Sequence, residues 1–192
     1  MDFAALIARV QRILLSPATE WDTIAGEAAD VQKIYMSYVG PLVIAAALVG
    51  AIALMSFGFG FGLVLQLAIT QIVLGLISVY VVAFVINALA PTFGATADMG
   101  QAFKLAAYSP TGSWIGGLFV IIPVLGGIVA IVGALYSLYL FYVGLPKLMR
   151  PPQDKVLIYT LSIIGVMIVI YILIGAITSS MMPSMTPMMR MR

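Results

Sequence analysis

Long runs of apolar residues, separated by short polar or glycine-rich stretches, dominate the chain after residue 34. Five of these runs can cross an apolar layer of about 30 Å as helices, because a helix rises about 1.5 Å per residue. We predict spans at residues 35–57, 63–89, 101–122, 124–145 and 156–179. The pattern therefore predicts an all-α fold, a polytopic membrane helix bundle with five transmembrane helices in residues 35–179, preceded by an N-terminal amphipathic helix.

That amphipathic helix is predicted in residues 2–15, where apolar residues recur three or four positions apart. They are Phe3, Leu6, Ile7, Val10, Ile13 and Leu14. Two roles fit such a helix: it can lie in the membrane interface, or it can pack against the protein's own cytosolic loops. No small-residue cleavage site follows it, so we do not interpret it as a secretory signal peptide.

A second short helix is predicted after Ser16, because Pro17 suits the first position of a helix. The stretch up to residue 34 is acidic, with Trp21 and Ile24 as apolar anchors. Its carboxylates can form a solvated face or a patch that docks another protein. Residues 1–34 are thus predicted to be a cytosolic amphipathic and acidic segment.

Small residues line one side of the fourth predicted span: Gly126, Ala130, Gly133, Ser137 and Gly144. At 100° per residue they stay within roughly 40° of one line. Small residues let helix backbones approach closely, which is how helices associate in a bilayer. We therefore predict that this stripe is a helix-packing surface and that the other spans pack around it.

The third predicted span contains Tyr108, Ser109 and Pro110. Proline removes a helical hydrogen bond and disfavours helical geometry at the residue before it, which predicts a kink or break. Broken helices mark binding sites in some transporters, although they also serve simple packing. Near the start of this span, Lys104 is expected to extend its ammonium group to the lipid headgroups.

The second predicted span carries Gln71, Gly75 and Ser78 on one face. Such polar groups either form hydrogen bonds between helices or line a water-filled path. No charged residue is predicted deep within any span, which argues against an ion-coupled carrier.

The distribution of Lys and Arg predicts the orientation. Seven of the nine fall on the side of the N-terminus and two, Arg190 and Arg192, fall on the tail. Cytoplasmic loops are enriched in Lys and Arg. We therefore predict a cytoplasmic N-terminus and, after five spans, a C-terminus on the opposite side.

The tail, residues 180–192, is rich in methionine, with Met182, Met185 and Met188 spaced three residues apart. Thioethers are soft ligands that suit Cu(I), but methionine is also a common apolar filler. Copper binding by this tail is one hypothesis, and apolar filling is the simpler interpretation.

The composition of the chain argues against several classes of function. Only 8% of residues are charged, against about 25% in soluble domains. The net charge is +2, and no basic cluster with interleaved aromatics predicts nucleic-acid binding. Histidine and cysteine are absent from the sequence, which removes the usual zinc ligands and nucleophile pairs. We therefore predict no cofactor and no enzymatic activity.

Two segments resemble signatures of the Yip-domain family, the Ypt-interacting proteins. Tyr38-Val39-Gly40-Pro41 is similar to its Tyr-Gly-Pro pattern, and Ala107-Tyr108-Ser109-Pro110 to its Gly-Tyr pattern. The acidic residue that precedes the first pattern in eukaryotic members is missing here, and Ala107 replaces a glycine. Leu15-Ser16-Pro17 followed by Trp21 resembles the bacterial branch.

The resemblance implies a five-span fold with a cytosolic N-terminus. Eukaryotic members are associated with Rab-type GTPases, partly through a longer N-terminal region. The N-terminal segment here is short, so the resemblance is carried over for fold and topology and not for vesicle traffic.

Two functions remain. The first is a non-catalytic membrane-organising or scaffolding protein of the bacterial inner membrane, whose partners are lipids, itself or another membrane protein. The alternative is a channel or uncoupled transporter for a small solute, ion or lipid. Its candidate pathway and motif residues are Gln71, Ser78, Tyr38, Gly40, Pro41, Tyr108, Ser109 and Pro110.

Overall fold

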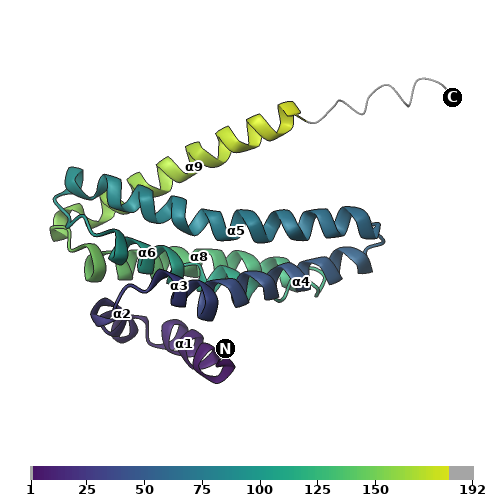
Figure 1. The fold of residues 1–192 in the computed structure, drawn as a ribbon, viewed down its shortest axis with the longest axis horizontal. Coiled ribbons are helices and arrows are strands. Elements are labelled where there is room, and N and C mark those ends of the chain that lie inside the picture. Colours follow the sequence, from purple (N-terminus) through teal and green to yellow (C-terminus); the bar gives the residue numbers. More distant parts are fainter. Residues whose placement is uncertain (1, 182–192) are drawn as a thin grey trace.

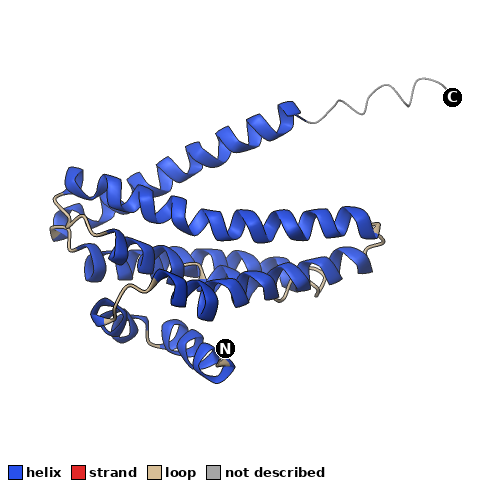
Figure 2. Ribbon diagram, in the orientation of Figure 1, coloured by secondary structure: helices blue, strands red, loops and turns tan. Residues whose placement is uncertain are grey.

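The structure is a computed structural model that describes residues 2–181, with side chains described to residue 173. Every regular element in this part of the chain is helical, which confirms the all-α prediction (Figure 2). The elements are α1 (Phe3–Leu15), α2 (Pro17–Gly26), α3 (Val31–Ile34), η1 (Tyr35–Val39), α4 (Gly40–Ser56), α5 (Phe61–Leu89), η2 (Ala90–Phe93), α6 (Met99–Tyr108), α7 (Thr111–Gly117), α8 (Leu125–Met149), η3 (Gln153–Lys155) and α9 (Val156–Met181).

Four helical stretches of the described residues are long and apolar enough to cross a membrane. They are Val31–Ser56, Phe61–Phe93, Leu125–Met149 and Gln153–Leu173. They agree with the first, second, fourth and fifth predicted spans, so a polytopic membrane helix bundle is confirmed.

The third predicted span, residues 101–122, is not among these four. It is divided into α6, of 10 residues, and α7, of 7 residues, which meet at Ser109 and Pro110. The break therefore lies where proline predicts it. The second part is shorter than expected because Gly116 and Gly117 favour helix less than other residues do and the chain turns there.

The helices run alternately up and down a bundle in which α6 and α7 lie beside α8, while α9 diverges from α5 (Figure 1). The starts of α6 and α9 and the ends of α5 and α8 meet at one end (Figure 1). Contacts between chain segments hold this end together: Thr96 N donates to Met149 O at 2.8 Å, and Tyr159 Oη donates to Ile86 O at 2.5 Å.

We call residues 2–43, 79–111 and 140–163 the charged end, because they contain all the charged residues of the described chain. The cations are Arg9, Arg12, Lys33, Lys104, Lys147, Arg150 and Lys155. The carboxylates are Asp2, Glu20, Asp22, Glu27, Asp30, Asp98 and Asp154. Residues 44–78, 112–139 and 164–173 form the membrane half.

The core lies mainly at the charged end, where the largest buried side chains gather. They are Trp21, Tyr159, Phe103, Lys104, Ile13, Ile24, Ile86, Leu105, Leu140, Leu145, Met149 and Val39. Along the membrane half the large apolar side chains are mostly exposed, such as Ile52, Ile69 and Ile131. Apolar exposure of this kind is what a lipid-facing surface requires.

The first long helix begins with a π-helical turn, η1, for a local reason. Pro41 has no backbone N–H, so an ordinary helical bond to Ser37 O cannot form. Instead Gly40 N donates to Tyr35 O, five residues back. A Cβ at Gly40 would lie 2.9 Å from that same oxygen, so this turn favours glycine.

Candidate functional site

The first two helices pack against the rest of the charged end. We call α1 and α2 together the N-terminal pair. Asp2 caps α1 by accepting bonds from Ala4 N (3.0 Å) and Ala5 N (3.1 Å). Pro17 occupies the first position of α2, as predicted, although the Ser16 side chain makes no capping bond. Trp21 and Ile24, the predicted anchors, are completely buried.

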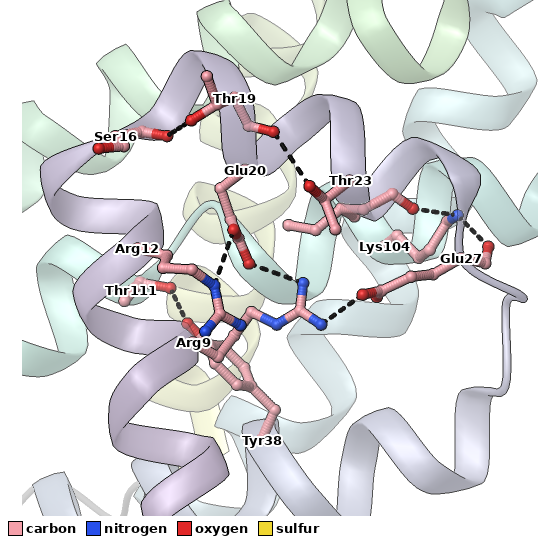
Figure 3. Close-up of polar contacts among 11 residues, drawn as sticks. Arg9, Arg12, Ser16, Thr19, Glu20, Thr23, Glu27, Tyr38, Lys104 and Thr111 are labelled. Carbon is pink, nitrogen blue, oxygen red and sulfur yellow. Dashed lines mark hydrogen bonds and ion pairs between the residues drawn. The ribbon is translucent and has the colours of Figure 1, made fainter.

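Lys104 of α6 holds the end of α2 (Figure 3). Its Nζ donates to three backbone carbonyl oxygens: those of Ile24 (2.6 Å), Ala25 (3.3 Å) and Glu27 (2.7 Å). Carbonyls at the end of a helix lack intrahelical donors and carry partial negative charge, so an ammonium group suits them. Only 1% of the residue is exposed, so the prediction that it extends to the headgroups is wrong: α2 covers it.

An ion-pair cluster joins the two helices of the N-terminal pair (Figure 3). Glu20 accepts from Arg9 Nη1 at 2.8 Å and from Arg12 Nε at 2.9 Å, and only 4% of it is exposed. Arg9 Nη2 also pairs with Glu27 at 2.5 Å. The acidic connector is therefore not simply a solvated face, since two of its carboxylates pair with arginines of the same chain.

These partners favour the charged form of Arg9. Burial by itself lowers the pKa of this guanidinium, but its hydrogen bond with Glu27 and the charges of Glu27 and Glu20 outweigh burial and raise the pKa. Arginine is charged throughout the physiological range in any case. The cluster therefore keeps its cation at every pH at which the protein works.

The two signature segments meet beneath this cluster. The rings of Tyr38 and Tyr108 pack edge to face with centroids 4.6 Å apart, and the guanidinium of Arg9 lies 5.7 Å from the Tyr108 centroid. Tyr38 Oη and Thr111 Oγ1 are 2.8 Å apart, and Thr111 Oγ1 also lies 2.6 Å from Tyr108 O. The hydroxyl of Thr111 thus occupies the carbonyl end of α6, directly after Pro110.

A cavity of about 750 Å³ opens beside these tyrosines. Its walls come from α1, from the connection between α2 and α3, and from the first turns of the first long helix. The polar residues that line it are Asp2, Arg9, Arg12, Glu27, Asp30, Lys33, Ser37, Tyr38 and Tyr108. It contains equal numbers of cationic and carboxylate side chains.

The predicted small-residue stripe has two kinds of neighbour. A Cβ at Gly133 would collide with Gly112 O of α7, and one at Gly116 would lie 3.3 Å from Ala130 Cα. Ser137 Oγ accepts from Ser113 N at 2.8 Å. Gly126 abuts the backbone at Phe119, whereas a Cβ at Gly144 would lie 2.6 Å from Cε2 of the Trp21 indole.

The candidate pathway residues lie in three separate places. Ser78, Ser109 and Pro110 line a groove of about 450 Å³ between α5, α8 and α9, where the helices diverge. Tyr38 and Tyr108 line the cavity at the charged end instead. Gln71 is exposed on α5, and Gly40 and Pro41 shape the π-helical turn.

The copper hypothesis concerns residues beyond the described part of the chain. Met182, Met185 and Met188 of the proposed Cu(I) site lie outside residues 2–181. Between residues 2 and 181, no group of three or more His, Cys, Asp or Glu side chains is arranged to hold a metal ion. Sequence reasoning missed the roles of Lys104, Arg9 and Glu20, and the only local signal for them was their charge in a largely apolar chain.

Compared with known protein families, the chain matches the Yip1 domain over residues 12–176. The matched range includes the segments around Tyr38 and Tyr108 that carry the resemblance. Neither the curated proteins nor the solved structures give a match.

Proposed function

Because the chain belongs to the Yip1 domain family, we propose that it is a non-catalytic membrane protein that organises the bilayer or scaffolds other membrane proteins. Its place in the bacterial inner membrane, with a cytoplasmic N-terminus and a periplasmic C-terminus, is part of this proposal. The gathering of Lys and Arg at the charged end supports that orientation. Its partners are lipids, a second copy or another membrane protein.

The observation that carries the proposal is the way α1 is held. Leu6 and Ile13 are buried against the protein, whereas Phe3 is 64% exposed and Ile7 is 56% exposed. One edge of the apolar face thus packs on the bundle, and the other faces outward. A helix fixed in this way at the end of a span can insert its outer edge into one leaflet as a wedge.

The buried polar groups of the site favour a structural role over catalysis. Lys104 is bound by three carbonyls, Glu20 by two arginines and Tyr38 by Thr111. A catalytic acid, base or nucleophile must be able to reach a substrate. Lys104 instead attaches α2 to the bundle, Glu20 joins α1 to α2, and Tyr38 joins η1 to α7.

Single-cysteine labelling tests whether α1 enters the lipid, because the native chain has no cysteine. A fluorophore at Phe3→Cys or Ile7→Cys should be quenched by nitroxide-labelled lipids in reconstituted vesicles. The matched control is Gln11→Cys, an exposed polar site on the same helix. Equal quenching at Ile7 and Gln11 would contradict the proposed insertion.

The organising role itself is tested by vesicle shape. Vesicles containing the wild-type protein should deform at lower protein density than vesicles containing the Phe3→Ser, Ile7→Ser variant. The control variant Gln11→Ser should behave like wild type. Identical vesicle shapes for all three proteins, together with selective solute flux, would overturn the proposal.

The groove between α5, α8 and α9 supports a second candidate, an uncoupled permeation pathway for a small solute, ion or lipid. Four serines line it together with mostly apolar residues: Ser78, Ser109, Ser113 and Ser137. On this account, Ser78→Ala should reduce flux or lipid scrambling in vesicles, whereas Gln71→Leu, outside the groove, should not. Equal transport by wild type and Ser78→Ala would remove this candidate.

A further inference from the structure

The cavity at the charged end contains a buried tyrosine whose hydroxyl is unused. Tyr108 is only 6% exposed and lines the cavity. Its neighbours Tyr38 and Thr111 bond to each other, but Tyr108 Oη makes no hydrogen bond within the described part of the chain. Its oxygen is not one of the fully buried unpartnered atoms of the described residues, so it is open to the cavity and free to bond a ligand or solvent there.

Not all of the charge in the cavity is consumed by internal pairs. Arg12 uses Nε for Glu20, while its two terminal nitrogens have no partner among residues 2–173. Lys33 Nζ likewise forms no ion pair in that range. Two cationic groups therefore remain to bind an anion such as a phosphate.

Two carboxylates are also partly free. Asp2 and Asp30 cap α1 and α3, and each uses only Oδ1 for its capping bonds. Their second oxygens can accept from an ammonium group, as can Tyr108 Oη. The cavity thus offers a phosphate-binding pair and an ammonium-binding pair within one volume of about 750 Å³, the usual size of a small-molecule site.

A ligand that carries both a phosphate and an ammonium group would fit this cavity. The position of the cavity along the bundle indicates the source of such a ligand. The cavity is lined by Lys33, Ile34, Ser37 and Tyr38, in the first two turns of the candidate span Val31–Ser56. The ends of spans lie among lipid headgroups. A lipid headgroup is therefore within reach while its acyl chains remain in the bilayer.

We infer that this cavity binds the headgroup of a zwitterionic phospholipid with a primary ammonium group. Arg12 and Lys33 bind the phosphate, and Asp2, Asp30 and Tyr108 accept hydrogen bonds from the ammonium. A quaternary ammonium has no N–H to donate, so choline headgroups fit less well. This inference goes beyond the proposed function, because the wedge requires no particular lipid.

Native mass spectrometry of the full chain with an equimolar mixture of phosphatidylethanolamine, phosphatidylcholine and phosphatidylglycerol tests the inference. Wild type should retain phosphatidylethanolamine about tenfold better than phosphatidylcholine, the difference expected for one charge-assisted hydrogen bond. The preference should disappear in Asp2→Asn, Asp30→Asn. Asparagine caps helices as well as aspartate does, so this variant keeps both helix starts.

Further variants test the phosphate-binding residues and the tyrosine hydroxyl. Arg12→Gln, Lys33→Gln should weaken retention of phosphatidylethanolamine and phosphatidylcholine alike, and Tyr108→Phe should reduce the preference between them severalfold. The matched control is Asp154→Asn, Lys155→Gln, which changes the same kinds of charge at the same end but outside the cavity. This control should bind like wild type.

Wild-type protein without a preference for phosphatidylethanolamine, or a preference that survives in Asp2→Asn, Asp30→Asn, would overturn the inference. If soluble glycerophosphoethanolamine competed as effectively as the lipid, the conclusion that the ligand is a membrane lipid would be overturned. The fluorophore at Ile7 reports separately on insertion of α1, so failure of lipid selectivity and failure of the proposed function can be told apart.

Discussion

The charged end and the membrane half are held together by different forces. At the charged end, side chains bridge residues far apart in sequence: Lys104 reaches Ile24, and Tyr159 Oη donates to Ile86 O at 2.5 Å. In the membrane half, α7 and α8 approach through glycine backbones. The N-terminal pair is therefore attached by polar groups where the chain is charged, and helices associate by close backbone contact where it is apolar.

The largest effect is expected from Lys104→Met. Methionine fills a similar volume but leaves the carbonyls of Ile24 and Glu27 buried without their donor. Unsatisfied buried groups and the loss of charge-assisted bonds should lower the free energy of unfolding by about 3 kcal/mol. Thermal unfolding in detergent measures this loss, and limited proteolysis should show earlier cleavage between residues 16 and 34.

Lys155→Met provides the control for that variant, because Lys155 is an exposed lysine at the same end. It should unfold and be cleaved like wild type. Equal stability of the Lys104→Met protein would mean that the ammonium group does not anchor α2.

A somewhat smaller effect is expected in the membrane half from Gly133→Leu. The new side chain would meet the backbone of Gly112 and force α7 and α8 apart, which should cost about 2 to 3 kcal/mol. Gly127→Ala on the same helix is the control, since a Cβ there has nothing within 4 Å. If both variants have the melting temperature of wild type, close backbone contact does not stabilise the packing of α7 on α8.

Two ion pairs of the charged end should differ in strength. Glu20→Gln weakens two bonds to arginines at a buried site and should cost about 2 kcal/mol. Asp22→Asn breaks the pair with Lys147, in which the lysine side chain is 40% exposed and the aspartate 60%, and should cost less than about 0.5 kcal/mol. If thermal unfolding showed the same loss of unfolding free energy for both variants, the buried pair would not be the stronger one, contrary to this expectation.

An effect between those of Glu20→Gln and Asp22→Asn is expected for Tyr38→Phe. The ring still packs on Tyr108, and only the bond with Thr111 is lost, so the loss of stability should be about 1 kcal/mol. Tyr139→Phe, which changes an exposed hydroxyl on α8, is the control and should leave the melting temperature unchanged. A loss above about 3 kcal/mol would show that the hydroxyl does more than bind Thr111.

Local chemistry made part of this structure predictable. Apolar runs predicted the four long helical stretches, and Pro110 predicted the break between α6 and α7. Asp98 caps α6 through Gly100 N and Gln101 N, two and three residues after it in the chain. Each of these outcomes depends on residues within a few positions of one another.

The attachment of the N-terminal pair was not predictable in the same way. Lys104 was expected at the headgroups because, on its own helix, it lies near a span end. Its actual partners lie far earlier in the chain, in and just after α2, and no pattern along the sequence relates them. The same holds for Gly144, whose neighbour Trp21 is a side chain of α2 and not another span.

Hydrogen exchange of the full chain in lipid nanodiscs tests the central claim that the N-terminal pair is anchored on the charged end. Backbone amides of α1 and α2 between Val10 and Thr23 should exchange slowly in wild type and Lys155→Met, and much faster in Lys104→Met. Rapid exchange of these amides in wild type, or equal protection in all three proteins, would contradict the claim.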